Sequence, residues 1–230
     1  MAVIYAESRS TPSLFQGDGQ DQKLQSGRIG QLFTEAEVSR LVKAGYGYCA
    51  NAGKGSSPIT FAGVYDADAP DMYFYVPSSV VLIPLSIEVI FEAVGTESTM
   101  EIIALASSTA DSSATVTGGA AVTPVNLRLD KTGAGNCTVS YGVDAAGITD
   151  PNAGRYFEFW KYQRPLTDTV ATTENDRLPL VFRWRAFVDG PPPFIYTSSD
   201  ASLSIYAASQ AGTGFITVTY LEVPPTWIVT

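Results

Sequence analysis

Residues 83–93 read IPLSIEVIFEA, and this stretch decides the fold. Its odd-numbered positions are all apolar: Ile83, Leu85, Ile87, Val89, Phe91 and Ala93. Ser86, Glu88 and Glu92 lie between them and point to the opposite face. A period of two is typical of a β-strand with one buried face. The stretch therefore predicts a long strand that lies against a core.

The same alternation recurs along most of the chain. It is clear in residues 125–129, 137–141, 182–188 and 216–220, and shorter runs occupy 59–65, 72–76, 100–106 and 201–207. Turn residues separate these runs, and no helical period follows residue 46. Many strands without interleaved helices favour an antiparallel arrangement, and their number suits a jelly roll. We predict an all-β fold, an antiparallel β-sandwich (jelly-roll) domain, over residues 46–230.

The first 45 residues predict an N-terminal arm and one short helix. Residues 7–31 are rich in Ser, Gln, Gly and Asp, and their few apolar side chains are Leu14, Phe15, Leu24 and Ile29. Such a segment cannot bury enough surface to fold alone. Two interpretations stay open: an unstructured end, or an extended arm that orders on a partner through those four side chains.

The helix is signalled by local chemistry. Thr34 and Glu37 fit a capping box, in which each side chain satisfies a free backbone N–H. Val38, Leu41 and Val42 form an apolar stripe, and Gly45 is suited to the position after the last turn. We expect about ten residues of helix that pack as a strut against a sheet.

The composition excludes several kinds of chemistry. The chain of 230 residues has no histidine, which removes Ser-His-Asp and Cys-His catalysis and histidine-ligated zinc. Its net charge of −9 argues against nucleic acid as a partner. The longest apolar stretch, residues 80–94, is too short and too polar to cross a bilayer, so we expect no membrane contact. We expect no catalytic residues, no cofactor and no metal.

Three near-motifs fail on spacing. Residues 53–57 (GKGSS) lack the first glycine and the hydroxyl residue of a phosphate-binding loop, which leaves a surface loop. Asp66, Asp68 and Asp71 lack the glycine and closing glutamate of a calcium loop, so a solvated turn is favoured over a cation site. Glu88 and Glu92 stand about 13 Å apart along a strand, too far for a glycosidase pair.

Other polar residues have structural explanations. Arg183 and Arg185 are expected to pair with Glu88 and Glu92 on a neighbouring strand, although a small basic patch is an alternative. Cys49 and Cys137 are interpreted as two buried free thiols, with a disulfide as the alternative.

The densest aromatic segment is residues 156–162 (YFEFWKY), which is aromatic on both sides of any strand. One side is expected to join the core and the other to form an interface, because Tyr and Trp are enriched at protein interfaces. Tyr156, Trp160 and Tyr162 are the predicted partner contacts, together with the four apolar residues of the arm.

Residues 58–223 resemble jelly-roll virion structural proteins of tailed bacteriophages. The resemblance is carried by residues 80–89 (VVLIPLSIEV), 124–128 (PVNLR) and 220–222 (YLE), together with the low charge and the polar arm. It implies a capsid cement or decoration protein on the virion's capsid surface. It also implies a homotrimer, with the major capsid protein as partner and with no catalytic residues to carry over.

Alternatives from two classes stay open. A phage head fibre or receptor-binding spike would share the homo-oligomer but would bind a host glycan through its outer loops. A carbohydrate-binding β-sandwich module would bind sugar through exposed aromatic side chains. An enzyme without histidine is the remaining alternative.

Overall fold

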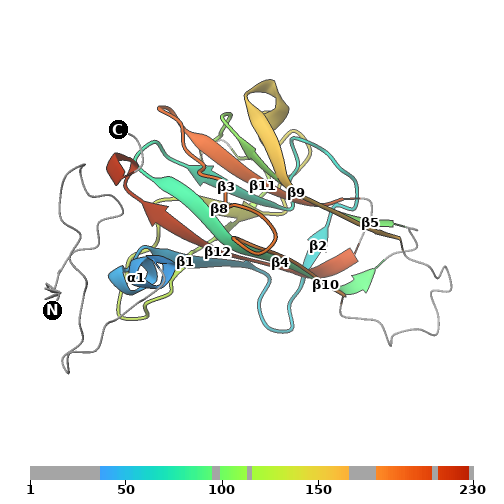
Figure 1. The fold of residues 1–230 in the computed structure, drawn as a ribbon. Helices are drawn as coiled ribbons and strands as arrows, with labels where there is room; N and C mark the ends of the chain where they lie inside the picture. The colour runs from blue at the N-terminus through green and yellow to red at the C-terminus, as the bar shows by residue number, and fades with distance from the viewer. Residues whose placement is uncertain (1–36, 95–98, 113–115, 166–179, 209–211, 228–230) are drawn as a thin grey trace, which may run out of the picture.

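The computed structural model describes residues 37–94, 99–112, 116–165, 180–208 and 212–227. Two six-stranded antiparallel sheets pack face to face, and the helix α1 (Glu37–Ala44) lies at one end of this sandwich (Figure 1). The predicted all-β sandwich is confirmed. The arm contacts Leu14, Phe15, Leu24 and Ile29 lie outside the described residues, and so does Thr34. Within the described ranges, no helix is both long and apolar enough to span a membrane.

The first sheet has the order β10-β4-β12-β1-β7, and β2 also pairs with β12. Its strands are β10 (Leu180–Arg185), β4 (Val81–Val94), β12 (Gly212–Val223), β1 (Gly47–Ala52), β7 (Val125–Asn126) and β2 (Ile59–Phe61). The second sheet has the order β6-β8-β3-β11-β5-β9. Its strands are β6 (Ala120–Val122), β8 (Thr138–Tyr141), β3 (Met72–Val76), β11 (Ala201–Ala208), β5 (Thr99–Ser107) and β9 (Tyr156–Pro165). Two short 3₁₀ turns, η1 (Pro151–Ala153) and η3 (Pro225–Trp227), complete the described elements.

The pairing is that of a jelly roll. Four nested pairs, β1 with β12, β3 with β11, β4 with β10 and β5 with β9, make one long antiparallel ribbon of eight strands. The ribbon is folded so that β12 also pairs with β4 and β11 also pairs with β5. A double-sheet jelly roll follows, because these two additional ladders close each half of the ribbon into a sheet. The jelly-roll prediction is therefore confirmed.

Strand β4 departs from the predicted single buried face. The pairing register with β12 shifts between Ser86 and Pro84, which leaves Leu85 as a bulge. Ile87 therefore faces the core between the sheets, whereas Ile83 and Leu85 belong to an apolar cluster on the outer face. Proline cannot donate to the ladder and is found in sheets mainly at bulges and edges. Pro84 thus explains why the alternation changes face within one strand.

The outer cluster is covered by α1, which confirms the predicted strut. Leu41 of the helix is buried there beside Val81, Leu221 and Val223, and Val42 packs against its rim. Gly45 has a φ of +93°, so the chain leaves the helix through a left-handed residue that glycine adopts without strain.

Two predicted strands are shorter than expected. Val125, Leu127 and Leu129 are exposed, whereas Asn126 between them is buried. The Asn126 amide donates to the Gly45 carbonyl at 2.7 Å, and its oxygen accepts from the next loop. The polar residue is inward because it supplies hydrogen bonds, so β7 is only two residues long.

In the run 182–188, the predicted burial of Phe182 and Trp184 is confirmed. The strand ends at Arg185, however, and Val188 is exposed in a turn.

Candidate interaction surface

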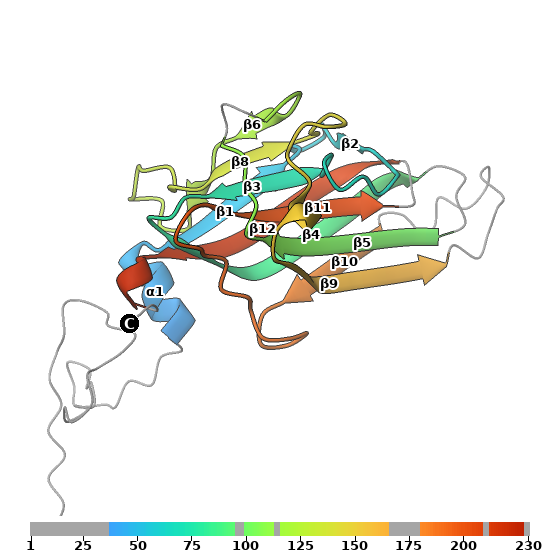
Figure 2. The same cartoon turned by 90° about the horizontal axis from the view of Figure 1, so that it is seen from above.

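Strand β9 is the last strand of the second sheet and pairs only with β5 among the described residues. The register shifts opposite Phe159, which is left as a bulge. Directly opposite residues share a face, so Phe157, Trp160 and Tyr162 all point toward the interior of the sandwich. Strand β10 is the corresponding last strand of the first sheet, and β9 and β10 lie along one side of the molecule (Figure 2).

Aromatic rings bridge the two sheets along this side. The centroid of Phe159 lies 5.1 Å from that of Trp184, and Tyr162 lies 5.2 Å from Phe182, so β9 contacts β10 through side chains alone. The sandwich is therefore closed here by rings rather than by backbone pairing. Phe182 and Trp184 are buried, whereas Tyr162 remains 46% exposed.

The structure separates the three predicted contacts on β9. Tyr156 and Tyr162 remain 48% and 46% exposed, as a surface contact requires. Trp160 is only 8% exposed and belongs to the main core. The prediction for Trp160 is corrected because the bulge at Phe159 turns the indole inward.

The turn after β10 displays further apolar side chains that the sequence did not identify. Phe187 is 71% exposed and has a φ of +65°, a conformation that is strained for a bulky side chain. The turn is held by Asp189, whose carboxylate accepts from the Arg185 N–H at 2.7 Å, and by the Phe187 N–H donating to Gly190. Asp189-Gly190 could have predicted a turn, but the sequence contains no signal for the left-handed phenylalanine.

A surface cavity of about 480 Å³ connects the start of β9 with the segment before β11. Its walls include Arg155, Tyr156 and Phe157 on one side and Phe194 and Tyr196 on the other. We define the aromatic edge as the exposed apolar residues of this side of the molecule: Tyr156, Phe157, Tyr162, Phe187, Val188 and Phe194.

Charges along the aromatic edge are close to balanced. Arg183 pairs with Glu88 across the strands, which confirms that prediction, whereas Arg185 pairs with Asp189 at 3.5 Å rather than with Glu92. Lys161 pairs with Glu101 at 3.0 Å. Among the described residues, this region has five cations, Arg155, Lys161, Arg164, Arg183 and Arg185, and four carboxylates, Glu88, Glu101, Glu158 and Asp189. The described part of this region is therefore nearly neutral, on a chain whose net charge is −9.

The acidic loop after β2 is a structural clamp. Asp71 is buried, and its two oxygens accept from the backbone N–H groups of Ala62 at 2.9 Å and Ala207 at 2.7 Å. Burial raises the pKa of Asp71 to about 6, against the opposing effect of the two N–H donors. The solvated-turn prediction is therefore wrong for Asp71, although it holds for the half-exposed Asp66 and Asp68.

Asp66 and Asp68 lie close enough for their hydrogen bond to raise the pKa of Asp66. Asp68 also accepts from the Ala146 N–H at 3.1 Å. Across the described ranges, no three histidine, cysteine, aspartate or glutamate side chains come together as a metal site.

The clamp holds this loop over the outer face of the second sheet. The Tyr206 hydroxyl donates to the Ala67 carbonyl at 2.8 Å, and the Tyr65 ring packs 5.0 Å from the Tyr206 ring. Ile103 and Leu105 are buried in the same outer cluster. Strands β5 and β11 are consequently buried on both faces.

The remaining sequence predictions have simple outcomes. Lys54 and Ser57 close a tight turn between β1 and β2 through two backbone hydrogen bonds, as a surface loop would. Cys137 is a buried free thiol, whereas Cys49 is free and only half-buried. Burial and the neighbouring Glu222 raise the pKa of the Cys137 thiol, which keeps it protonated and unreactive.

We compared the chain with known protein families, curated proteins and solved structures. No family model, no curated protein and no solved structure matches this chain.

Proposed function

We propose that this chain is a virion structural protein, a capsid cement or decoration protein that binds the outside of a major capsid lattice as a homo-oligomer. Its role is to stabilise the shell by assembly rather than by catalysis. The proposal follows the resemblance of residues 58–223 to phage virion proteins. The single structural observation that supports it is the aromatic edge.

Among the described residues, the end strands of the two sheets differ in a way that favours assembly on one side. The two end strands opposite the aromatic edge, β6 and β7, have three and two residues, which is a common protection against unwanted pairing. The end strands on the aromatic edge, β9 and β10, have ten and six residues. Exposed aromatic side chains beside long end strands are typical of an interface.

The occupant that fits this edge is a second copy of the chain. Two copies that each carry −9 repel one another at most orientations. Among the described residues the aromatic edge is nearly neutral, and Glu158 lies between the cations Arg155 and Lys161 at the start of β9. Two such edges can therefore approach without net repulsion and can bury their rings. Contact between two identical edges closes a two-fold dimer, whereas the trimer implied by the resemblance requires this edge to meet a different surface of the next copy.

The test measures the mass of the full chain by sedimentation velocity. The variant Tyr156→Ser/Phe194→Ser removes both walls of the 480 Å³ cavity and should yield monomer under conditions where the original chain is oligomeric. The control Val64→Ser/Leu129→Ser removes two side chains that are 71% and 87% exposed elsewhere, and it should leave the oligomer unchanged. A monomeric original chain would contradict the proposal.

A second measurement concerns the capsid. Co-sedimentation with shells of the major capsid protein from the same genome should be lost when residues 1–33 are deleted, while the oligomer should remain. Full decoration of shells by the truncated chain would show that the arm is not the tether. Reproducible binding to a glycan array without capsid binding would instead favour the spike or sugar-binding alternative.

A further inference from the structure

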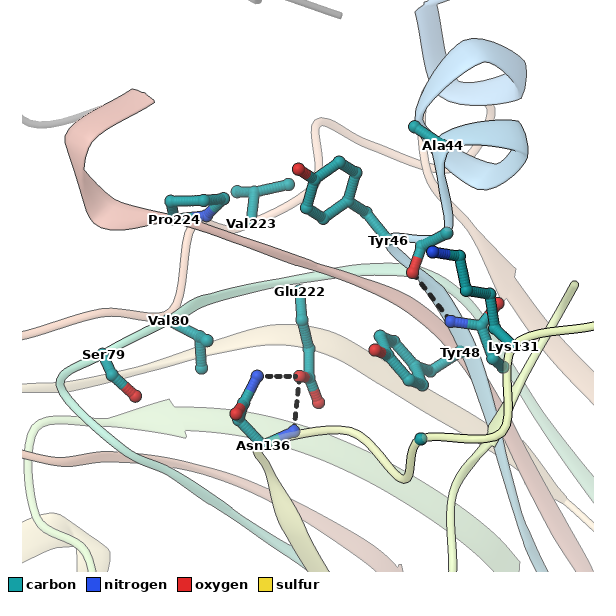
Figure 3. Close-up of a pocket in the computed structure, with 13 residues that line it drawn as sticks. Ala44, Tyr46, Tyr48, Ser79, Val80, Lys131, Asn136, Glu222, Val223 and Pro224 are labelled. Atoms are coloured by element: carbon teal, nitrogen blue, oxygen red, sulfur yellow. Dashed lines mark hydrogen bonds between the residues drawn. The ribbon is translucent and has the colours of Figure 1, made fainter. Parts of the chain in front are cut away.

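A second cavity opens at the end of the sandwich that carries α1. It has a volume of about 420 Å³, within the usual range for small-molecule sites. Its wall is formed by the ends of β1 and β12 and by the loop before β8 (Figure 3). Tyr46, Tyr48, Asn136 and Glu222 converge on it, and Ser79 lies at its rim. We call this cavity the Glu222 cleft.

Glu222 places a carboxylate deep in this cleft. The side chain is 3% exposed, and it accepts from the Asn136 backbone N–H at 2.6 Å, the Asn136 amide at 3.2 Å and the Cys137 N–H at 3.1 Å. Gly135 permits this wrapping, because a Cβ there would lie 2.3 Å from a Glu222 oxygen. All three donors are neutral, and a carboxylate offers about four acceptor positions. The Cys137 thiol also hydrogen-bonds to Glu222, so every partner of this buried carboxylate among the described residues is neutral.

Two tyrosines line the cleft, and Tyr48 is the one whose hydroxyl points toward the Glu222 carboxylate. The Tyr48 ring is stacked on Tyr220 with centroids 5.9 Å apart, and its hydroxyl points toward the cleft (Figure 3). The Tyr46 ring is held edge-on by Trp227 at 4.9 Å. Burial raises the pKa of the Tyr48 hydroxyl, Asn126 lowers it by hydrogen bonding, and the Glu222 charge raises it further. The Glu222 carboxylate and the Tyr48 hydroxyl are therefore close enough to interact electrostatically.

No cation of the described part of the chain forms an ion pair with Glu222. Lys131 lines the same cleft, but its side chain packs beside Gly45, where a Cβ would lie 3.2 Å from the lysine Cε. Figure 3 shows its ammonium directed toward the end of α1 and away from the Glu222 carboxylate. That position is favourable in its own right, because the C-terminal end of a helix carries partial negative charge.

We propose that the Glu222 cleft binds an alkylammonium or guanidinium group, as carried by a lysine or arginine side chain. A buried carboxylate with only neutral partners is stabilised by a cation that comes within hydrogen-bond distance of it. The tyrosine rings add a favourable surface for the same charge. The net charge of −9 raises the local concentration of such cations. This inference is independent of the proposed assembly.

The test uses capped amino acids as probes of the full chain. N-acetyl-lysine methylamide and N-acetyl-arginine methylamide should bind at least ten times more tightly than the neutral N-acetyl-norleucine methylamide, measured by calorimetry or NMR titration. Butylamine carries the ammonium group without a peptide backbone. Its affinity relative to the lysine probe shows whether the cleft takes a free small amine or a side chain of a polypeptide. Equal binding of the norleucine probe, or no binding of either cation, would overturn the proposal.

Variants locate the binding within the cleft. Glu222→Gln should reduce binding of the cationic probes at least tenfold. Since Glu222 also holds the loop before β8, Ser79→Trp provides a second variant that fills the cleft from its exposed rim and leaves the Glu222 hydrogen bonds intact. Lys131→Met removes a neighbouring positive charge and should preserve or strengthen binding. Unchanged binding in Ser79→Trp, or lost binding in Lys131→Met, would place the cation elsewhere and overturn the proposal.

Discussion

The outer face of the second sheet and the aromatic edge both carry apolar side chains, but only the first is covered by the chain itself. On the outer face, Ile103, Leu105 and Tyr206 are buried in one cluster, and the loop that Asp71 clamps packs on Tyr206. On the aromatic edge, Phe187 and Phe194 remain 71% and 56% exposed. Within the described residues, the chain therefore uses polar clamps to cover one apolar surface and leaves the other free. The difference indicates which surface is available for a partner.

The largest expected effect is on the covered face. Asp71→Ala removes the acceptor of two backbone N–H groups, one of them buried on β11. We expect a loss of about 2–4 kcal/mol in the free energy of unfolding, since a buried donor without a partner is costly. Urea unfolding measures this loss. The control Asp68→Ala removes one half-exposed acceptor and should cost less than about 1 kcal/mol. Equal losses of unfolding free energy in the two variants would contradict the assignment of Asp71 as the clamp.

The same clamp predicts a dependence on pH. The pKa of Asp71 is raised from 3.8 to about 6 in the folded chain, so the folded state binds a proton more tightly than the unfolded state. The contribution of Asp71 to stability should therefore fall as pH rises from about 4 to about 6, by about 3 kcal/mol in all. Other carboxylates titrate in this window, so the measured quantity is the difference between the original chain and Asp71→Ala. A difference that does not change with pH would show that Asp71 keeps its ordinary pKa.

A substitution on the aromatic edge is expected to affect the monomer and the oligomer in opposite directions. Phe187→Asn replaces a phenylalanine of φ +65° by a residue that tolerates left-handed backbone. The unfolding free energy of the monomer should stay the same or rise by up to about 1 kcal/mol. The oligomer should dissociate at least ten times more readily, because an exposed aromatic contact is lost. Thermal unfolding and sedimentation separate the two effects, and a destabilised monomer would show that Phe187 serves the fold.

The sequence predicted the strands because alternation records which face is buried. It gave the bounds of β3 without error and the inward face of Phe182 and Trp184. It could not predict the bulges at Leu85 and Phe159, because each depends on the register of a partner strand far along the chain. Those two bulges moved Ile83 to the outer face and Trp160 into the core.

The Glu222 cleft was missed for a related reason. A single glutamate near the end of an apolar strand has no pattern that marks it as buried. Its burial depends on Gly135, Asn136 and Cys137, which are about 85 residues away in the sequence and approach it only in the folded sandwich. The clamp at Asp71 is comparable, because its partner Ala207 lies 136 positions away.

The smallest expected effects come from removing one tyrosine hydroxyl on the covered outer face and one on the aromatic edge. Tyr206→Phe removes the donor to the Ala67 carbonyl on the covered face and should cost about 1 kcal/mol of unfolding free energy. Tyr162→Phe removes the hydroxyl of a ring that is 46% exposed on the aromatic edge, where solvent can replace any partner. It should leave the monomer within about 0.5 kcal/mol of the original chain. Denaturant unfolding of both variants under monomeric conditions makes the comparison. A larger cost for Tyr162→Phe would mean that the aromatic edge contributes to folding, and the contrast between a covered and an available surface would fail.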